Sequence, residues 1–268
     1  MAGDVVRVLI VRRGKFMHTI SKKAGQTLCI ILVITICLVS AQSVIPDELH
    51  SVILSALSQA DSIGMNPDPE LSRELIQSVI DDLKTADALT VNYTSSGEIS
   101  QEISDVMLSY IDSWKELMVV YGYLIDGGEQ KNEAYTALLS NSSDRYDISL
   151  AKFTLAKDYY SKAYEALEGT EELLKKTDAD ALSDILPDAS IPDNEAINKM
   201  LFRLRDNTMI CQAYIDLCST GIAKASSGDA NSTEVQEPLV NATTLMKKLI
   251  PSPFVGEEAA LFVNITFS

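Results

Sequence analysis

The chain contains 268 residues, of which 22 are basic and 38 are acidic, so its formal net charge is −16 at neutral pH. An acidic surface repels the phosphate backbone that supplies most nucleic-acid affinity, and we therefore expect no nucleic-acid partner. With only two His and four Cys, we expect no zinc ribbon, no His-rich metal site and no disulfide framework.

The first 44 residues have the composition of a targeting sequence. Residues 1–26 hold six basic side chains and one acid, whereas the rest of the chain holds 16 basic and 37 acidic side chains. Residues 27–44 carry no charge and are mostly apolar. This order of charges is typical of a chain whose amino end stays in the cytoplasm and whose body crosses the membrane. It predicts a basic cytoplasmic leader over residues 1–26 and a membrane-inserting segment over residues 27–44.

Two outcomes are open for residues 27–44. Their apolar centre, residues 28–39, fits the hydrophobic region of a signal peptide, about 7–15 residues, better than a membrane span of about 20. The triplet Val39-Ser-Ala41 has the small side chains that a signal peptidase reads, which favours cleavage before Gln42. If the segment is retained, it forms a single signal-anchor helix. A start at Met17 would leave a shorter basic leader in front of it.

Helical periodicity dominates the body of the chain. The first helix is predicted to begin at Pro46 and to end before Gly64. The second is predicted to begin at Pro69, with Asp68 as its cap, and to run to about Leu89. Both carry apolar residues at spacings of three and four along one face, which indicates that one side of each helix is buried.

The middle of the body contains two helix starts and one predicted break. The pattern Ser95-x-x-Glu98 is typical of a capping box and predicts the start of a third helix, which is then interrupted at Asp126-Gly-Gly128. A short helix is predicted over residues 129–139. A longer one continues to about Lys176, with this apolar stripe toward the core: Ile148, Ala151, Leu155, Tyr159, Ala163, Ala166, Thr170 and Leu173.

The most regular repeat follows the cap candidate Asp193. Nine positions alternate spacings of four and three residues and predict a heptad seam like that of a coiled coil: Ile197, Leu201, Leu204, Thr208, Cys211, Ile215, Cys218, Ile222 and Ala225. A helix of about 30 residues is about 45 Å long. The predicted fold class is therefore all-α, an elongated antiparallel helical bundle with long heptad-like helices over residues 45–227.

Residues 228–268 are predicted to form a C-terminal helix and a strand-like tail. Residues 235–250 fit one more helix, which Pro251 ends, and residues 260–267 alternate apolar and polar side chains as a strand does. A strand is not stable alone. The tail is thus a candidate docking element, whose partner is another segment, another copy or another protein.

The predicted site residues are acceptors for N-linked sugars. Five Asn are followed by x-Ser or x-Thr, and all lie beyond the apolar segment: Asn92, Asn141, Asn231, Asn241 and Asn264. A Ser-rich chain also produces such patterns by composition, so both interpretations stay open.

Residue types that carry chemistry do not form a recognisable motif, and we expect no catalytic, cofactor or metal site. His50 is the one His of the body and has no nucleophile pattern near it. Cys211 and Cys218 lie about 10 Å apart on an unbroken helix, too far for a disulfide, and are predicted to be core residues. The acids between Asp178 and Glu195 favour a solvated connection over a calcium loop, because the ordered calcium-loop pattern is missing.

Aromatic side chains gather on the third helix and on the next long helix. They either fill the core, which we favour, or line a pocket for a small or sugar-like ligand: Tyr110, Trp114, Tyr121, Tyr123, Tyr159, Tyr160 and Tyr164.

The sequence therefore predicts a non-catalytic extracytoplasmic envelope protein that acts as a helical-bundle structural or interaction module. We expect it to be secreted, or anchored in the membrane through residues 27–44 with its N-terminus inside, and to bind a protein partner or to self-associate. The alternative is a ligand-binding sensory or solute-capture bundle that works with a separate membrane partner. A third interpretation is an enzyme that uses carboxylates alone, but the sequence contains no motif for such an enzyme.

Overall fold

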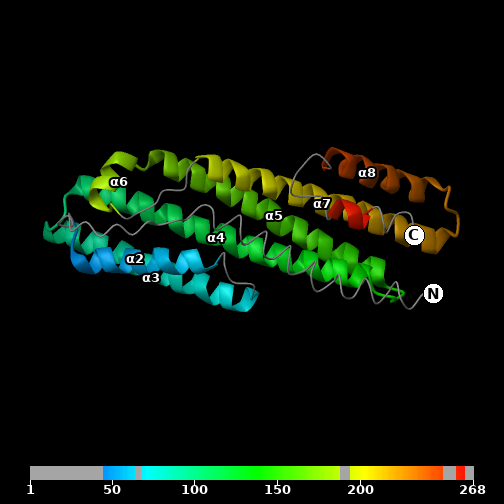
Figure 1. The fold of residues 1–268 in the computed structure, drawn as a ribbon, viewed down its shortest axis with the longest axis horizontal. Helices are drawn as coiled ribbons and strands as arrows, with labels where there is room; N and C mark the ends of the chain where they lie inside the picture. Colours follow the sequence, from blue (N-terminus) through cyan, green and yellow to red (C-terminus); the bar gives the residue numbers. More distant parts are fainter. Residues whose placement is uncertain (1–44, 64–67, 188–193, 250–257, 263–268) are drawn as a thin grey trace. The chain divides into compact units, whose positions relative to one another are not determined.

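The computed structural model describes residues 45–63, 68–187, 194–249 and 258–262, and every regular element in those ranges is helical (Figure 1). Residues 258–262 are helical as well. Successive long helices run antiparallel, which confirms the predicted all-α antiparallel bundle. The elements are α2 (Asp47–Ile63), α3 (Pro69–Ser96), α4 (Gln101–Leu138), α5 (Arg145–Lys176), α6 (Ala179–Ile185), α7 (Asn194–Ser227) and α8 (Thr233–Leu249).

The helices form two compact units. The first contains the described residues up to Met118 together with Thr170–Ala196. The second contains Val119–Gly169 and the described residues from Ile197 onward. Helices α4 and α5 each contribute residues to both units.

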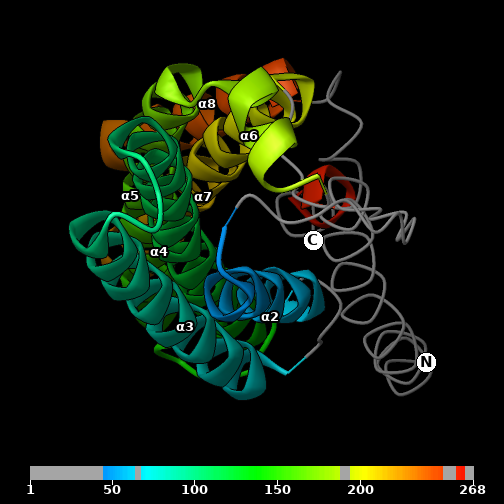
Figure 2. The same ribbon diagram turned by 90° about the vertical axis from the view of Figure 1, so that its left-hand side faces the viewer.

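In the first unit, α2 lies against α3 (Figure 2). Asp68 caps α3 as predicted, because its side chain accepts hydrogen bonds from the backbone N–H groups of Glu70 and Leu71, and Pro69 occupies the first turn. The predicted inward faces are confirmed by the buried residues of the two helices: Leu49, Ile53, Ala56, Leu57, Ala60 and Ile63 on α2, and Ile76, Val79, Leu83 and Ala86 on α3.

The predicted boundary between the second and third helices is wrong. Helix α3 continues past Leu89 to Ser96 and ends at Gly97, whose φ of 78° is left-handed. The N–H groups of Gly97 and Glu98 donate to carbonyls of the last turn of α3, the pairing typical of a glycine-terminated helix. Ser95 therefore belongs to the end of one helix and does not start the next. Helix α4 begins at Gln101, after Ser100, whose hydroxyl accepts a hydrogen bond from the N–H of Ile103.

The predicted break at Asp126-Gly-Gly128 is also wrong, because α4 is continuous for 38 residues. Gly127 is buried, and a Cβ atom at this position would lie 3.0 Å from the ring of Tyr160 on α5. Glycine costs a helix about 1 kcal/mol relative to alanine. Here it lets an aromatic ring pack directly on the helix backbone, and that burial offsets the cost.

The first half of the predicted core stripe on α5 faces solvent. Ile148 and Leu155 are 42% and 47% exposed, and Ala151 between them is exposed as well. A parallel stripe with strict four-three alternation is buried instead: Ser149, Phe153, Ala156, Tyr160, Ala163, Leu167 and Thr170. The two stripes share Ala163 and Thr170, whereas the predicted Ala166 and Leu173 are only half-buried. The buried stripe begins with a polar residue, Ser149, so the spacing of apolar residues alone does not reveal it. The Ser149 hydroxyl is satisfied inside the core because it donates a hydrogen bond to the carbonyl of Ala134.

The predicted seam on α7 is confirmed at four of its nine positions, which are almost fully buried: Ile197, Leu204, Cys211 and Cys218. The other five are half-buried or, at Ala225, exposed. A second face of the same helix is buried too, and it includes Ile210, Ala213, Tyr214 and Leu217. Helix α7 therefore packs on two sides.

The strand-like tail is not confirmed. Residues 258–262 are helical, so the predicted strand is wrong over residues 260–262, and residues 263–268 lie outside the described ranges. The preceding helix is confirmed as α8.

Candidate functional site

The second unit holds a buried ionic and aromatic cluster that joins three helices to residues 258–262. We call Lys131 of α4, Tyr160 of α5, and Asn207 and Tyr214 of α7 the Lys131 site. We call residues 258–262 the C-terminal segment. Both Lys131 and Glu258 are buried, with side chains 7% and 8% exposed. An ion pair at this depth is uncommon, because charged side chains are rarely buried unless paired.

The ammonium group of Lys131 has three kinds of partner. Its Nζ lies 3.6 Å from the Glu258 carboxylate and donates a hydrogen bond of 2.6 Å to the amide oxygen of Asn207. It also lies 5.6 Å from the centre of the Tyr160 ring, a cation–π distance. The amide nitrogen of Asn207 donates to the carbonyl of Arg203, which fixes the amide with its oxygen toward Lys131.

The C-terminal segment is held at two points one helical turn apart. The hydroxyl of Tyr214 donates a hydrogen bond of 2.9 Å to the backbone carbonyl of Glu258. The ring of Phe262, which is also buried, meets the edge of the same Tyr214 ring at 5.7 Å between centres. Tyr214 therefore binds the segment through its hydroxyl and through its ring.

Tyr214 is itself fixed by two more aromatic side chains. Its ring stacks on Phe153 at 4.9 Å and meets Tyr135 edge-on at 5.0 Å. Tyr135 and Phe153 also meet edge-on at 5.1 Å. Such pairs add about 0.5–1.5 kcal/mol each beyond the area they bury. The Tyr214 ring that contacts the C-terminal segment is thus packed on two other rings.

The surroundings of the Lys131 site raise the pKa values of Lys131, Tyr160 and Cys211. Burial alone lowers the pKa of Lys131, but the Tyr160 oxygen, the Glu258 carboxylate and the Cys211 thiol outweigh it and raise the pKa above its ordinary value. Burial raises the pKa of Tyr160 and of Cys211 to about 12, although Lys131 lowers both. At neutral pH the lysine stays charged and the thiol stays protonated, so neither is activated as a nucleophile.

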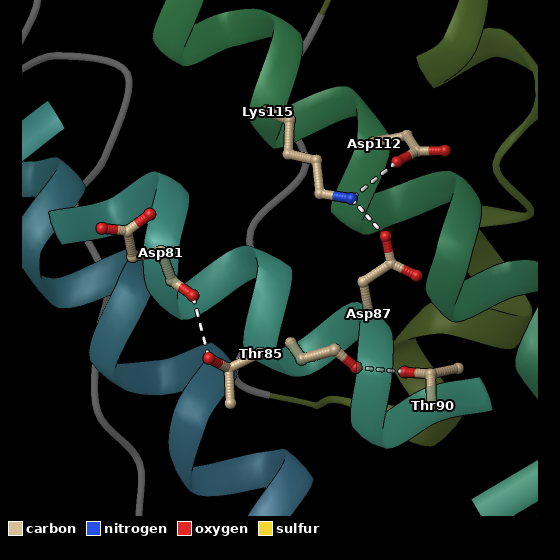
Figure 3. Close-up of polar contacts among 7 residues, drawn as sticks. Asp81, Thr85, Asp87, Thr90, Asp112 and Lys115 are labelled. Carbon is tan, nitrogen blue, oxygen red and sulfur yellow. Dashed lines mark hydrogen bonds and ion pairs between the residues drawn. The ribbon is translucent and has the colours of Figure 1, made fainter. Parts of the chain in front are cut away.

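A second ionic contact, which is partly exposed, lies in the first unit, between α3 and α4 (Figure 3). Lys115 donates to Asp87 of α3 at 2.5 Å and to Asp112 of its own helix at 3.1 Å. Burial opposes the charge of Lys115, but these two hydrogen bonds outweigh it and raise the pKa. Nearby, the buried hydroxyl of Thr90 donates to the carbonyl of Ala86. This contact ties two helices together through exposed and half-buried groups.

The sequence-predicted sugar acceptors are not brought together. Asn92 lies within α3, Asn141 in the connection between α4 and α5, Asn231 in the turn before α8, and Asn241 within α8. All four are exposed. Asn264 lies outside the described residues.

The aromatic side chains singled out from the sequence divide into two groups. Tyr110, Trp114, Tyr121 and Tyr160 are buried, as the core interpretation predicts. Tyr123, Tyr159 and Tyr164 are half-buried. Of these, Tyr123 of α4 and Tyr159 of α5 meet across the two helices, with ring centres 6.3 Å apart. Lys162 lies 5.8 Å from the centre of the Tyr159 ring.

The remaining candidates have structural positions. Cys211 and Cys218 are free and buried, and His50 is half-buried on α2. Asp178 caps α6 by accepting hydrogen bonds from the N–H groups of Asp180 and Ala181. Within the described ranges, no group of three or more His, Cys, Asp or Glu side chains is placed to hold a metal ion.

No helix among the described residues is long and apolar enough to span a membrane. Residues 27–44, for which a membrane segment is predicted, lie outside those ranges.

Sequence reasoning missed the Lys131 site for a specific reason. From Ile99 to Leu124 the sequence leading into and through α4 repeats core-type residues at alternating spacings of four and three. If this repeat is continued through Gly127, its next position is Lys131. The predicted helix break at Gly127 and Gly128 ended this repeat before it reached Lys131. A charged residue on a seam position was the signal that pointed to a buried partner.

Comparison with known proteins gives no match: no family model, no curated protein and no solved structure resembles this chain significantly.

Proposed function

We propose that this protein is a non-catalytic extracytoplasmic module whose helical bundle acts by binding a protein segment. The observation that carries this proposal is the Lys131 site, which holds a short helical segment through one ion pair, one hydrogen bond to a backbone carbonyl and one aromatic contact. These are the contacts by which interfaces hold peptides, with a central aromatic anchor and a paired charge.

The protonation states of the buried groups support a binding role over catalysis. The raised pKa of Lys131 keeps it cationic, and the thiols of Cys211 and Cys218, both with a pKa of about 12, stay protonated. Catalytic bases and nucleophiles need the opposite shift, toward the working pH. A lysine that stays cationic, such as Lys131, serves well as the partner of a carboxylate.

The location outside the cytoplasm rests on the order of charges along the chain, with a basic leader, an uncharged apolar segment and an acidic body. The test is the intact mass of the native protein combined with protease treatment of whole cells. We expect a body that external protease reaches, and a mass that corresponds to loss of residues 1–41 or to retention of the anchor. Each sugar would add its own mass. A full-length, unprocessed chain found free inside the cells would overturn this location.

A ligand-binding bundle is the second candidate, because Tyr123 and Tyr159 meet across α4 and α5 while half-exposed. Small-molecule sites are lined mostly by hydrophobic and aromatic side chains, the type that this pair contributes. A thermal-shift screen with metabolites and sugars tests it, since a specific ligand raises the unfolding midpoint by mass action. Tyr159→Leu should abolish that rise, and Tyr93→Leu in the other unit should preserve it. Absence of any rise across the screen favours the peptide-binding module.

A further inference from the structure

We propose that Asn141 and Asn231 carry N-linked sugars and that Asn92 and Asn241 do not, although all four have the same sequence pattern. This inference rests on the proposed location outside the cytoplasm, because such sugars belong to exported chains. Asn141 and Asn231 lie in connections between helices, and we call them the connection acceptors. Asn92 lies within α3 and Asn241 within α8, and we call them the helical acceptors.

Acceptor patterns are more frequent in this chain than its composition predicts. Ser and Thr make up 44 of its 268 residues, so by chance about one or two of its ten Asn would have one of them two positions later. Five do. This excess favours sugar attachment over coincidence. All four acceptors in the described ranges are exposed, so the backbone conformation, and not exposure, distinguishes them.

Sugar transfer requires two side chains to be recognised together. The Asn amide nitrogen forms a bond to the anomeric carbon of a polyisoprenyl-phosphate-linked oligosaccharide. The bond between that carbon and the phosphate oxygen breaks, the phosphate leaves with the electron pair, and the amide loses one proton. Because the pattern also demands a hydroxyl two positions after the Asn, the transferase must contact that hydroxyl at the same time.

The helical acceptors hold these two side chains apart. In an α-helix, side chains two positions apart do not face each other, so one enzyme surface cannot contact both. The hydroxyls are also engaged and half-buried. Thr94, two positions after Asn92, donates a hydrogen bond of 2.7 Å to the carbonyl of Thr90. Thr243, two positions after Asn241, donates one of 2.8 Å to the carbonyl of Leu239.

Asn92 lies about one turn from the end of α3, but that end is fixed. The hydroxyl of Tyr93 donates a hydrogen bond of 2.8 Å to Glu48 of α2. The N–H groups of Gly97 and Glu98 donate to carbonyls of the last turn of α3. Sugar transfer to Asn92 would therefore require these contacts to break first.

The connection acceptors present both side chains without unwinding a helix. Asn141 has no regular structure, and Ser143 two positions later is exposed. Asn231 lies in a turn, where its backbone N–H donates to Asp229, and Thr233 is an exposed residue at the first position of α8. In the part of the chain that the structure describes, the side chains of these acceptors and of their hydroxyl residues make no hydrogen bond.

The two connection acceptors lie at the same end of the second unit. Tyr146, in the first turn of α5, packs on Gly221 near the end of α7, so the connection before α5 and the connection after α7 are at one end (Figure 1). Two sugars attached there would cover this end of the unit and leave the sides of its helices uncovered.

Transfer to the folded chain tests the selection. The full chain, made in a host without N-glycosylation, is incubated with a purified single-subunit oligosaccharyltransferase and a polyisoprenyl-linked oligosaccharide. Mass spectrometry of its peptides measures the sugar at each Asn. We expect transfer to the connection acceptors to be at least about tenfold faster than transfer to the helical acceptors, because a helical acceptor must first unfold locally. Four synthetic peptides of equal length, each centred on one acceptor, should not show this difference.

Matched pairs of variants check the assignment by the mass of the whole chain. Asn141→Gln with Asn231→Gln should remove the sugar, whereas Asn92→Gln with Asn241→Gln should leave it unchanged. Equal rates at all four positions of the folded chain would overturn the proposal. The same tenfold difference among the peptides would overturn it as well, because the selection would then come from the sequence and not from the fold.

A proline before Asn92 gives the converse test. Val91 is 49% exposed, so Val91→Pro removes little packing but breaks α3 directly before the acceptor. Asn92 should then accept sugar, whereas in the control Val91→Ala, which keeps the helix, it should not. Circular dichroism must show that the rest of the helix content is retained. A folded proline variant without sugar at Asn92 would contradict the role of the helix.

In protein isolated from its own cells, we expect sugar on both connection acceptors and on neither helical acceptor. Sugar on a helical acceptor, or its absence from a connection acceptor, would overturn the proposal. Protease treatment of whole cells separates this failure from a failure of the proposed location. A body without sugar that external protease reaches leaves the location standing, whereas a body without sugar that is enclosed in the cell overturns both.

Discussion

Lys131 and Asp61 show two outcomes for a charged side chain that is partly or fully removed from water. Lys131 is tolerated inside the second unit because Glu258, Asn207 and the Tyr160 ring surround its ammonium. Removing one partner of such a pair costs about 3–5 kcal/mol, because the other charge stays buried. Asp61 of α2 has no such compensation, since its Oδ1 atom is buried and accepts no hydrogen bond within the described residues. It also lies in the last turn of α2, where the helix dipole disfavours a negative charge.

We therefore expect Asp61→Asn to stabilise the protein at pH 7 by about 0.3–1 kcal/mol, the range for a charge at a helix end. Burial raises the pKa of Asp61 above its ordinary value of 3.8. Between the unfolded and folded pKa values the folded chain binds more protons, so the free energy of unfolding falls as pH rises. The gain from Asn should thus be complete above the folded pKa and vanish below about pH 3.8.

Urea unfolding of the Asp61→Asn variant and the unmodified protein at pH 7 and pH 3 measures this difference. The control is Asp47→Asn in the first turn of the same helix, where an acid is favourable, so that the substitution should destabilise by a similar amount. A gain at position 61 that is as large at pH 3 as at pH 7 would show that the charge is not its cause.

Among the helices themselves, two glycines mark the points where an aromatic ring from a neighbouring helix meets the backbone. Gly127 of α4 faces Tyr160, and Gly221 of α7 faces Tyr146, whose ring atoms would lie 2.7 Å from an added Cβ atom. Gly169 of α5 is different, because nothing lies within 4 Å of its Cβ position. Glycine at positions 127 and 221 serves helix packing, whereas at 169 it has no packing neighbour.

Gly221→Ala is expected to destabilise the protein by about 1–3 kcal/mol, the cost of overpacking, even though alanine is the better helix former. Gly169→Ala should instead stabilise it by up to about 1 kcal/mol. Thermal or urea unfolding followed by circular dichroism measures both changes. Expectations of opposite sign for one substitution type make the pair decisive, and stabilisation by both variants would argue that Tyr146 does not pack on α7.

At the scale of the whole molecule, the number of reactive cysteine thiols depends both on folding and on removal of the leader. Cys211 and Cys218 are buried, and burial raises the pKa of each thiol to about 12. Cys29 and Cys37 lie within residues 27–44, the segment that a signal peptidase would remove. The number of reactive thiols therefore depends on both the folded state and the leader.

We expect neither Cys211 nor Cys218 to react with iodoacetamide at pH 8 in the folded protein, because the thiolate is the reactive form and is scarcely populated. After denaturation, the mass should increase by two labels if the leader has been removed and by four if it is retained. Rapid labelling of two sites in the folded, processed protein would contradict the burial of these thiols.

Much of the fold follows from local pattern. The buried faces of α2 and α3, the cap at Asp68 and the seam of α7 were predictable because a helix repeats every 3.6 residues, so the spacing of apolar side chains marks the buried side. The order of basic, uncharged and acidic segments along the chain is likewise a property of the sequence alone.

Only the tertiary structure decided which of several plausible faces meet. On α5 it selected Phe153 and Tyr160 over Ile148 and Leu155, because those rings stack on other helices. It also kept α4 continuous through Gly127, and it paired Lys131 with Glu258, which lies far along the chain. Periodicity is a local property of the chain, whereas the partner of a buried charge or ring is fixed by segments distant in sequence that pack together, and no spacing rule encodes that choice.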